Sequence, residues 1–189
     1  MPEVKPLVHR QRTIMRTVRH ALPFAAALLA AGCATAPTPV QARSGSIDAI
    51  NHTHWAINRF SVNGRNAVDI IGPYQGGGGA CCFAVPAQWK PGMTVRVDWE
   101  TGVGYSFDFP GYENREKYLE WKQKIRSQKR QHSQVAPVPD YSGQDTCGIT
   151  VHFLPCDQLK VTTSCLTYDN PNYPIKLPLR LPEPTSCPK

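Results

Sequence analysis

The stretch GPYQGGGGACCFAVPAQWKPG, residues 72–92, combines four consecutive glycines, two adjacent cysteines and a Trp-Lys-Pro-Gly turn. A phosphate-binding P-loop requires Lys-Ser/Thr and a helix after its glycines, and a dinucleotide loop requires spaced glycines. Here the glycines lead to Ala-Cys-Cys-Phe, with Pro86 soon after, so a phosphate loop is excluded. Glycine adopts backbone conformations that are closed to other residues. We therefore interpret the stretch as a tight corner in a β-rich domain.

Alternating residues on both sides of this corner predict β-strands. Aromatic and β-branched residues flank Asn63-Gly64, a dipeptide typical of a two-residue hairpin turn. The run TVRVDWE at residues 94–100 alternates apolar with polar residues, as a half-buried strand does. A second hairpin is predicted over residues 147–165, with its turn near Cys156. These patterns predict a mainly β (α+β) fold, a small antiparallel β-sandwich-like domain with two or more hairpins.

The N-terminal segment MRTVRHALPFAAALLAAGC, residues 15–33, has the pattern of an export signal. Basic residues precede an apolar run that is too short to cross a membrane as a permanent helix, and small residues precede Cys33. This arrangement resembles the bacterial lipobox, in which the cysteine is acylated and becomes the mature N-terminus. We predict a lipoprotein signal peptide over residues 1–32, of which 1–14 could be an upstream extension. The alternative is an ordinary signal peptide with a coincidental cysteine.

The predicted location is the cell envelope. An alanine rather than an aspartate follows Cys33, which in bacterial lipoproteins favours the outer membrane, with the domain facing the periplasm. Residues 33–46 are rich in Pro, Ser and Ala and are interpreted as a tether, followed by a single β-rich domain over 47–189. Removing the signal leaves 16 basic and 13 acidic residues, so the net charge falls from +7 to +3. We therefore predict no nucleic-acid partner.

The cysteines after Cys33 predict disulfides. They are even in number, which in an exported chain indicates up to three bridges: Cys81, Cys82, Cys147, Cys156, Cys165 and Cys187. The predicted hairpin places Cys147 opposite Cys165 at its open end, so we expect a bridge between them. Adjacent cysteines have Cα atoms about 3.8 Å apart across a trans peptide, closer than most disulfides allow. We therefore expect Cys81 and Cys82 each to pair elsewhere, with a bridge between the two as the alternative.

Residues 112–134 predict a basic amphipathic helix, because they lack Pro and Gly and are rich in helix formers. Tyr118, Trp121 and Ile125 recur at helical spacing, so one narrow stripe could pack on the sheet. Seven Lys/Arg and three Glu give the segment a net charge of +4. A basic surface of this kind suits an acidic partner or anionic lipid, and a solvated helix face is the alternative. The residues expected to contact a protein partner are Trp121, Lys122, Lys124, Lys129 and Arg130.

The remaining patterns concern the C-terminal tail and chemistry. The tail from Tyr168 to Lys189 is too rich in proline for regular structure, and we expect it to lie across the domain, held by Cys187. Hydrolase motifs are missing from the sequence, so we predict neither an enzyme nor a cofactor. His52 and His54 could join a third metal ligand. No partner follows at a recognisable spacing, so two surface histidines are the preferred interpretation.

The corner motif resembles a family of small bacterial lipoproteins whose domain has no assigned function. The stretches INHTHWAINRFSVNG upstream and VHFLP downstream are also similar to that family, and the similarity covers residues 47–177. Val95 and Val97 continue the motif as an alternating strand. The residues that carry the motif itself are Gly76, Gly77, Gly78, Gly79, Cys81, Cys82, Pro86, Trp89, Lys90, Pro91 and Gly92.

Members of this family are commonly encoded beside type VI secretion spike genes and phospholipase effectors. The resemblance therefore implies an immunity protein that binds a toxic periplasmic lipase and neutralises it, with the motif serving the architecture. Two other classes remain open from the residues. One is an envelope-structural lipoprotein that contacts anionic lipid, and the other is a small-ligand or metal-binding module.

Overall fold

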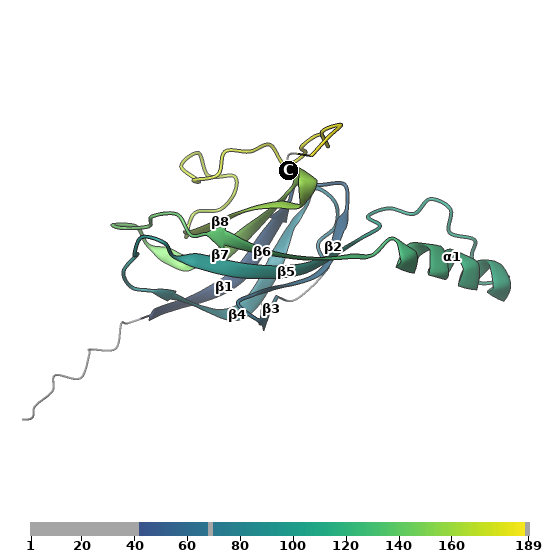
Figure 1. The fold of residues 1–189 in the computed structure, drawn as a ribbon, viewed down its shortest axis with the longest axis horizontal. Helices are drawn as coiled ribbons and strands as arrows, with labels where there is room; N and C mark the ends of the chain where they lie inside the picture. The colour runs from purple at the N-terminus through teal and green to yellow at the C-terminus, as the bar shows by residue number, and fades with distance from the viewer. Residues whose placement is uncertain (1–41, 68–69, 188–189) are drawn as a thin grey trace, which may run out of the picture. The chain divides into compact units, whose positions relative to one another are not determined.

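The computed structural model describes residues 42–67 and 70–187, which fold into a β-sandwich. Eight strands lie in these described residues, four in each of two sheets (Figure 1). The first, here called the β1 sheet, has the order β4 (Gly76–Pro86), β1 (Ala42–Asn51), β7 (Thr146–Leu154), β8 (Gln158–Ser164). The second, the β5 sheet, has the order β3 (Arg65–Asn66), β2 (Ala56–Val62), β5 (Thr94–Gly102), β6 (Arg130–Pro137). The predicted mainly β, sandwich-like fold is confirmed.

The core lies between the two sheets, because alternate residues of each strand point inward. In β5, Val95, Val97 and Trp99 are buried, as the alternation in TVRVDWE predicts. Phe153 of β7 contacts both Trp99 and Phe60, at ring-centroid distances of 5.7 and 5.4 Å. Burying one such side chain stabilises the fold by about 1.5–3 kcal/mol. These aromatic contacts join the two sheets across the sandwich.

Both predicted hairpins are present. Asn63 and Gly64 join β2 to β3 with φ angles of 50° and 75°, the positive values that a two-residue type I′ turn requires. The second hairpin joins β7 to β8 through a short 3₁₀ turn at Pro155–Asp157. The predicted turn near Cys156 is therefore confirmed.

Two features of the strands differ from the sequence-based expectation. β1 pairs with β7 in a parallel register, although an all-antiparallel arrangement was expected. A parallel pair requires a long connection between its strands, here residues 52–145, and no local pattern indicates such a pairing. β1 also begins by Ala42, so residues 42–46 of the predicted tether belong to a strand. They pair with β4 across one register shift, between Gly45 and Ser46.

The predicted helix over 112–134 is too long. Helix α1 covers Arg115–Ser127, and the chain from Arg130 onward forms strand β6 against β5. His132 of β6 stacks on Trp99, with the ring centroids 4.9 Å apart. The pairing of β6 with β5 depends on residues distant in the sequence. Helix propensity alone therefore predicted a helix that extends too far toward the C-terminus. In the described part of the chain, no helix is long and apolar enough to cross a membrane.

All six cysteines in the domain are paired. Cys147 and Cys165 are bridged at the open end of the β7–β8 hairpin with their Cα atoms 4.8 Å apart, which confirms the prediction. Cys156 in the hairpin turn is bonded to Cys187 in the tail. The expectation that Cys81 and Cys82 each pair elsewhere is wrong, because they are bonded to each other across a cis peptide and the other four thiols are used.

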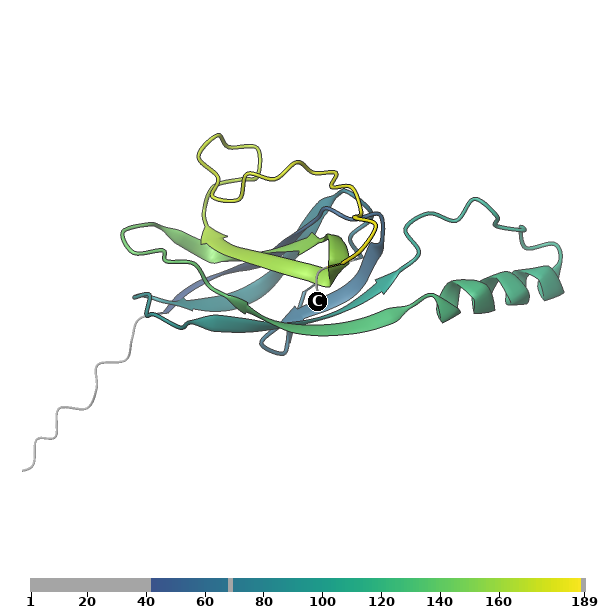
Figure 2. The same cartoon turned by 45° about the horizontal axis from the view of Figure 1, so that its top comes forward.

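The C-terminal tail lies against the outer face of the β1 sheet (Figures 1 and 2). The Leu181 amide donates to the carbonyl oxygen of His52, which follows β1. Tyr173 is buried, and its hydroxyl reaches His152 of β7. Together with the bridge at Cys187, these contacts confirm that the tail crosses the domain as an ordered strap. The predicted signal peptide, Cys33 and most of the tether lie outside the described residues.

Candidate protein-binding arm

Residues 103–128, here called the arm, connect β5 to β6 and contain a loop followed by helix α1. Figures 1 and 2 both draw α1 beside the sandwich, covering neither sheet. None of the 13 residues of α1 is buried. Most helical stability in proteins comes from burial of one apolar face against the body of the fold. The arm must therefore be held together by its own contacts.

Local sequence signals start and stop the helix. Asn114 is the N-cap, and its side-chain oxygen accepts a hydrogen bond from the Lys117 amide at 3.0 Å. Glu116 lies in the first turn, and Lys124 and Arg126 lie in the last, which matches the helix dipole at both ends. The helix therefore forms where its capping chemistry is best, within the longer predicted segment.

The aromatic stripe of α1 packs on the loop of the arm, whereas the sequence predicted packing on a sheet. The Trp121 indole donates to the Ser106 hydroxyl at 2.9 Å, and its ring meets the Phe109 ring at 4.9 Å. Lys124 donates to Asp108 at 2.5 Å. That hydrogen bond, with a second from Ser106, lowers the pKa of Asp108 to about 2. The loop and the helix thus form one folded hairpin-like unit.

The foot of the arm is fixed by a buried carboxylate in β5. Glu100 is 6% exposed and accepts hydrogen bonds from Lys129, Asn58 and Gln131, and Arg59 completes the cluster at 2.9 Å. The hydrogen bonds from Lys129 and Asn58 are the main causes that lower the pKa of Glu100 to about 2. The chain therefore leaves helix α1 and enters β6 in a defined direction.

Exposed apolar side chains are concentrated on the arm. Five of the eight large hydrophobic side chains found exposed belong to it, with these exposed fractions: Tyr105 57%, Phe107 97%, Phe109 42%, Tyr112 77% and Leu119 49%. Ring centroids of Tyr105 and Phe107 lie 6.2 Å apart, and those of Phe109 and Tyr112 lie 5.0 Å apart. Helix α1 adds five Lys/Arg and two Glu to the same arm. Exposed aromatic residues together with charged ones are typical of a protein–protein interface. We call these five side chains, four aromatic and one leucine, the aromatic patch.

The residues predicted to bind a partner have unequal positions. Lys129 pairs with Glu100, and the Arg130 guanidinium lies 4.6 Å from the Trp55 ring, so both support the foot of the arm. Trp121 and Lys124 make the internal contacts of the arm. Lys122 lies over the Tyr118 ring at 5.7 Å. All five residues lie in the arm or next to it. Four of them, Trp121, Lys124, Lys129 and Arg130, make contacts that support the structure of the arm and its foot.

Most of the aromatic patch was not predicted from the sequence. Tyr105, Phe107 and Phe109 lie in the loop, outside the segment predicted as a helix. The stretch YSFDFPGY, residues 105–112, holds four aromatic residues among Ser, Asp, Pro and Gly. Aromatic residues this dense in a turn-forming segment cannot all be buried, and this signal could have indicated the patch.

The two histidines considered for metal binding do not form a pair. His54 is about half exposed and lies 3.4 Å from Glu183, whereas His52 is completely buried. The prediction of two surface histidines is therefore wrong for His52, because the tail covers it. In the described ranges, no group of three or more His, Cys, Asp or Glu side chains could hold a metal ion.

His52 instead belongs to a directional hydrogen-bond chain. Its Nδ1 lies 2.8 Å from the Pro178 carbonyl, which can only accept, so Nδ1 carries the hydrogen. Neutral His52 then accepts at Nε2 from Nδ1–H of His152, 2.9 Å away, and His152 accepts at Nε2 from the Tyr173 hydroxyl at 2.7 Å. Burial lowers the pKa of His52, and it lowers that of His152 to about 3. This series of hydrogen bonds links the C-terminal tail to the β1 sheet.

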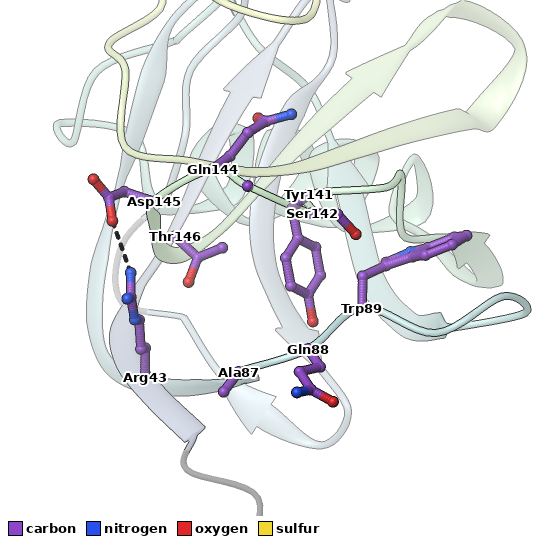
Figure 3. A pocket seen from close by; sticks show the side chains of 10 residues that line it. Arg43, Ala87, Gln88, Trp89, Tyr141, Ser142, Gln144, Asp145 and Thr146 are labelled. Atoms are coloured by element: carbon purple, nitrogen blue, oxygen red, sulfur yellow. Dashed lines mark hydrogen bonds and ion pairs between the residues drawn. The ribbon is translucent and has the colours of Figure 1, made fainter.

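The Trp-Lys-Pro-Gly motif has an architectural role. The Trp89 indole donates to the Val138 carbonyl at 3.0 Å, and the Tyr141 hydroxyl donates to the Pro86 carbonyl at 2.9 Å. Figure 3 shows the cleft of about 620 Å³ between these loops, with an ion pair of Arg43 and Asp145 at one end. Gly92 has a φ of +82°, which favours glycine in the turn before β5.

The family described as "Protein of unknown function (DUF3304)" matches residues 50–161, more than half of the chain. The matched segment runs from the end of β1 into β8 and includes the glycine-rich strand β4 and the whole arm. No curated protein and no solved structure matches the chain.

Proposed function

This chain belongs to the DUF3304 family, which has no known function, and from that premise we propose that the protein is a lipoprotein whose arm binds and neutralises a toxic enzyme. In this proposal Cys33 carries the lipid and anchors the protein in the outer membrane, with the domain facing the periplasm. The target is a (phospho)lipase effector delivered by type VI secretion, and the protein acts as its immunity partner. Binding, rather than catalysis, is the function assigned to the domain.

The aromatic patch is the observation that supports this proposal most strongly. Phe107 is 97% exposed and Tyr112 is 77% exposed, so a partner could bury nearly the whole of both rings. Aromatic side chains dominate the energy of protein interfaces, because each buries a large area at little cost in conformational entropy. The five Lys and Arg side chains of α1 lie in the same arm and suit an acidic region of the partner.

The construction of the arm suits an inhibitor. Contacts between Trp121, Phe109 and Ser106 fix the loop against the helix, and Glu100 fixes the foot. A preordered binding element loses less conformational entropy when it binds. A lipid anchor would also raise the local concentration of the inhibitor where a lipase attacks.

A protein partner fits the arm better than a lipid surface does. A helix that lies in a membrane interface needs a free apolar face. The apolar stripe of α1 is already turned toward the loop, where Trp121 meets Phe109. The charge of the arm does not separate the two partners, because the five Lys/Arg of α1 would attract an acidic protein and an anionic lipid surface alike.

The test is site-specific photo-crosslinking in living cells. A photoreactive phenylalanine analogue replaces Phe107 in one strain and Ile70, an exposed apolar residue outside the arm, in the control strain. We expect position 107 to cross-link to a phospholipase during exposure to the toxin, and position 70 to give no such product. Cross-links from position 107 to lipid alone, or to no lipase, would contradict the proposal.

A further inference from the structure

A second site lies far along the chain from the arm, on the outer face of the β1 sheet. There a cavity of about 550 Å³, which is open to solvent, lies between the tail and the sheet. Strands β1, β4 and β7 supply its floor, and the tail supplies two tyrosines, Tyr168 and Tyr173. We call this cavity the tyrosine pocket. It shares no lining residue with the arm or with the cleft of Figure 3.

The tyrosine pocket contains one charged side chain, the carboxylate of Asp48. Among the described residues, no lysine, arginine or histidine lies within salt-bridge distance of Asp48, and none lines the pocket. The carboxylate accepts a hydrogen bond from the Ser46 hydroxyl beside it. The negative charge therefore remains uncompensated inside a partly enclosed site, where charge interactions are stronger than in open water.

The two tyrosines form an aromatic corner of fixed geometry. Their ring centroids are 5.7 Å apart and their planes meet at 75°. The Tyr168 hydroxyl donates to the Leu177 carbonyl and the Tyr173 hydroxyl donates to His152, so a hydrogen bond fixes the orientation of each ring. Burial, followed by smaller effects that include the charge of Asp48, raises the pKa of Tyr173 to about 12.

The glycine run gives the floor of the pocket its shape. Gly76, Gly77 and Gly78 line it with main chain alone. Gly78 has a φ of +121°, and a Cβ there would lie 2.6 Å from the Ile47 carbonyl oxygen, so only glycine fits. A strand without side chains often marks a place where a ligand approaches the backbone closely. Gly78 therefore lets β4 pack closely against β1 beside Asp48, and this main chain forms part of the pocket floor.

We propose that the tyrosine pocket binds a small organic ammonium cation. A carboxylate attracts the positive charge, and the partly exposed ring of Tyr168 can attract a cation through the negative face of its π system, while the buried Tyr173 packs beside it. A metal ion is disfavoured by the same residues, because hard cations such as Ca²⁺ take six to eight oxygen ligands and usually several carboxylates. Hydroxyl groups of Thr150, Ser164 and Thr167 line the same cavity and can form hydrogen bonds with a polar group of the ligand, such as the hydroxyl of choline.

The test is isothermal titration calorimetry of the oxidised protein with choline as the probe. The matched control ligand is 3,3-dimethyl-1-butanol, which has the shape of choline with a neutral carbon in place of the nitrogen. We expect saturable binding of choline, and binding at least tenfold weaker for the neutral alcohol. Absence of choline binding at millimolar concentration, or equal binding of the two ligands, would overturn the proposal.

Variants locate the binding within the pocket. Asp48→Asn keeps an acceptor for Ser46 and removes the charge, so choline should bind at least tenfold more weakly. Tyr168→Leu should weaken binding at least fivefold, whereas Tyr168→Phe, which keeps the ring, should stay within twofold of the wild type. Asp145→Asn changes an exposed carboxylate in the other cleft and should have no effect. Choline binding that is unchanged in Asp48→Asn would contradict the assignment, and thermal unfolding checks that each variant is folded.

Discussion

Glu100 is the residue on which the direction of the arm depends. Its carboxylate lies at the foot of the arm among two cations and two amides, and it is almost completely buried. Removing one partner from a buried cluster leaves the others without compensation, which costs more than the hydrogen bond itself contributes. Replacing Glu100 with a neutral residue should therefore destabilise the folded protein.

We expect Glu100→Gln to lower the free energy of unfolding at pH 7 by about 1–3 kcal/mol. Because the pKa of Glu100 falls from 4.5 to about 2 in the folded protein, its contribution is present above pH 4.5 and is lost as pH falls toward 2. The difference between variant and wild type should therefore shrink over that range. Urea unfolding at several pH values measures it, with Glu120→Gln on the exposed face of α1 as the control.

His152 makes the tail sensitive to acid. Its pKa lies at about 3 in the folded protein, chiefly because of burial and also because His52 and Lys160 are close. In the unfolded chain the ring binds a proton near pH 6.5, so each pH unit below that value removes up to about 1.4 kcal/mol of stability. Stability should therefore fall from pH 6.5 toward pH 3.

The pH dependence of the free energy of unfolding in variants tests whether His152 is responsible for this loss of stability. We expect His152→Gln to be less stable than the wild type at pH 7 but to lose less stability between pH 6 and pH 4. His54→Gln, which changes the half-exposed histidine, should keep the wild-type slope because His152 is still present. Equal slopes for His152→Gln and the wild type would show that the buried chain is not the acid-sensitive element.

At the scale of elements, the arm is an independent unit. Its helix has an N-cap and packs on its own loop through Trp121, so local contacts stabilise it without help from the core. We expect Trp121→Ala to increase amide hydrogen exchange across α1 at least tenfold, with the exchange of β5 and β7 unchanged. Gln123→Ala, an exposed substitution in the same helix, should leave the exchange of α1 near the wild-type rate. Loss of protection throughout the sandwich would contradict the independence of the arm.

Local elements could be predicted from the sequence where the pattern is local. The hairpin at Asn63-Gly64, the strand at 94–100 and the Cys147–Cys165 bridge depend on residues close together in the chain or opposite each other in one hairpin. The end of α1 could not be placed, because β6 forms only by pairing with β5. The Cys81–Cys82 bridge was only the alternative, because a trans peptide was assumed between the two residues, and the peptide is cis.

At the scale of the whole molecule, the described domain is a sandwich with a strap and an arm. The parallel pairing of β1 with β7 joins segments about 100 residues apart, and the contact of His52 with the tail at Pro178 joins residues 126 apart. Sequence periodicity carries no information on such contacts. For the same reason the tyrosine pocket could not be predicted, since its Asp48 and Tyr168 lie in β1 and the tail.

The membrane anchor is also a property of the whole molecule, and it remains a prediction. We expect the mature protein to carry lipid on Cys33 and to fractionate with the outer membrane. Cys33→Ser should abolish metabolic labelling with palmitate and move the protein to the soluble periplasmic fraction. Cys187→Ser removes a different cysteine, one that is bonded to Cys156, and should leave the labelling intact. Labelling that persists in Cys33→Ser would contradict the anchor.

The affinity of the protein for its phospholipase partner tests the central claim most directly. Two hot-spot rings of an interface contribute about 2 kcal/mol each, and 1.4 kcal/mol corresponds to a tenfold change in Kd. Isothermal titration calorimetry should therefore show a Kd weaker by about several hundred-fold for the Phe107→Ala/Tyr112→Ala variant. Ile70→Ala changes an apolar residue that is 68% exposed and lies outside the arm, so its Kd should stay within twofold of the wild type. An unchanged Kd in the double variant would contradict the account.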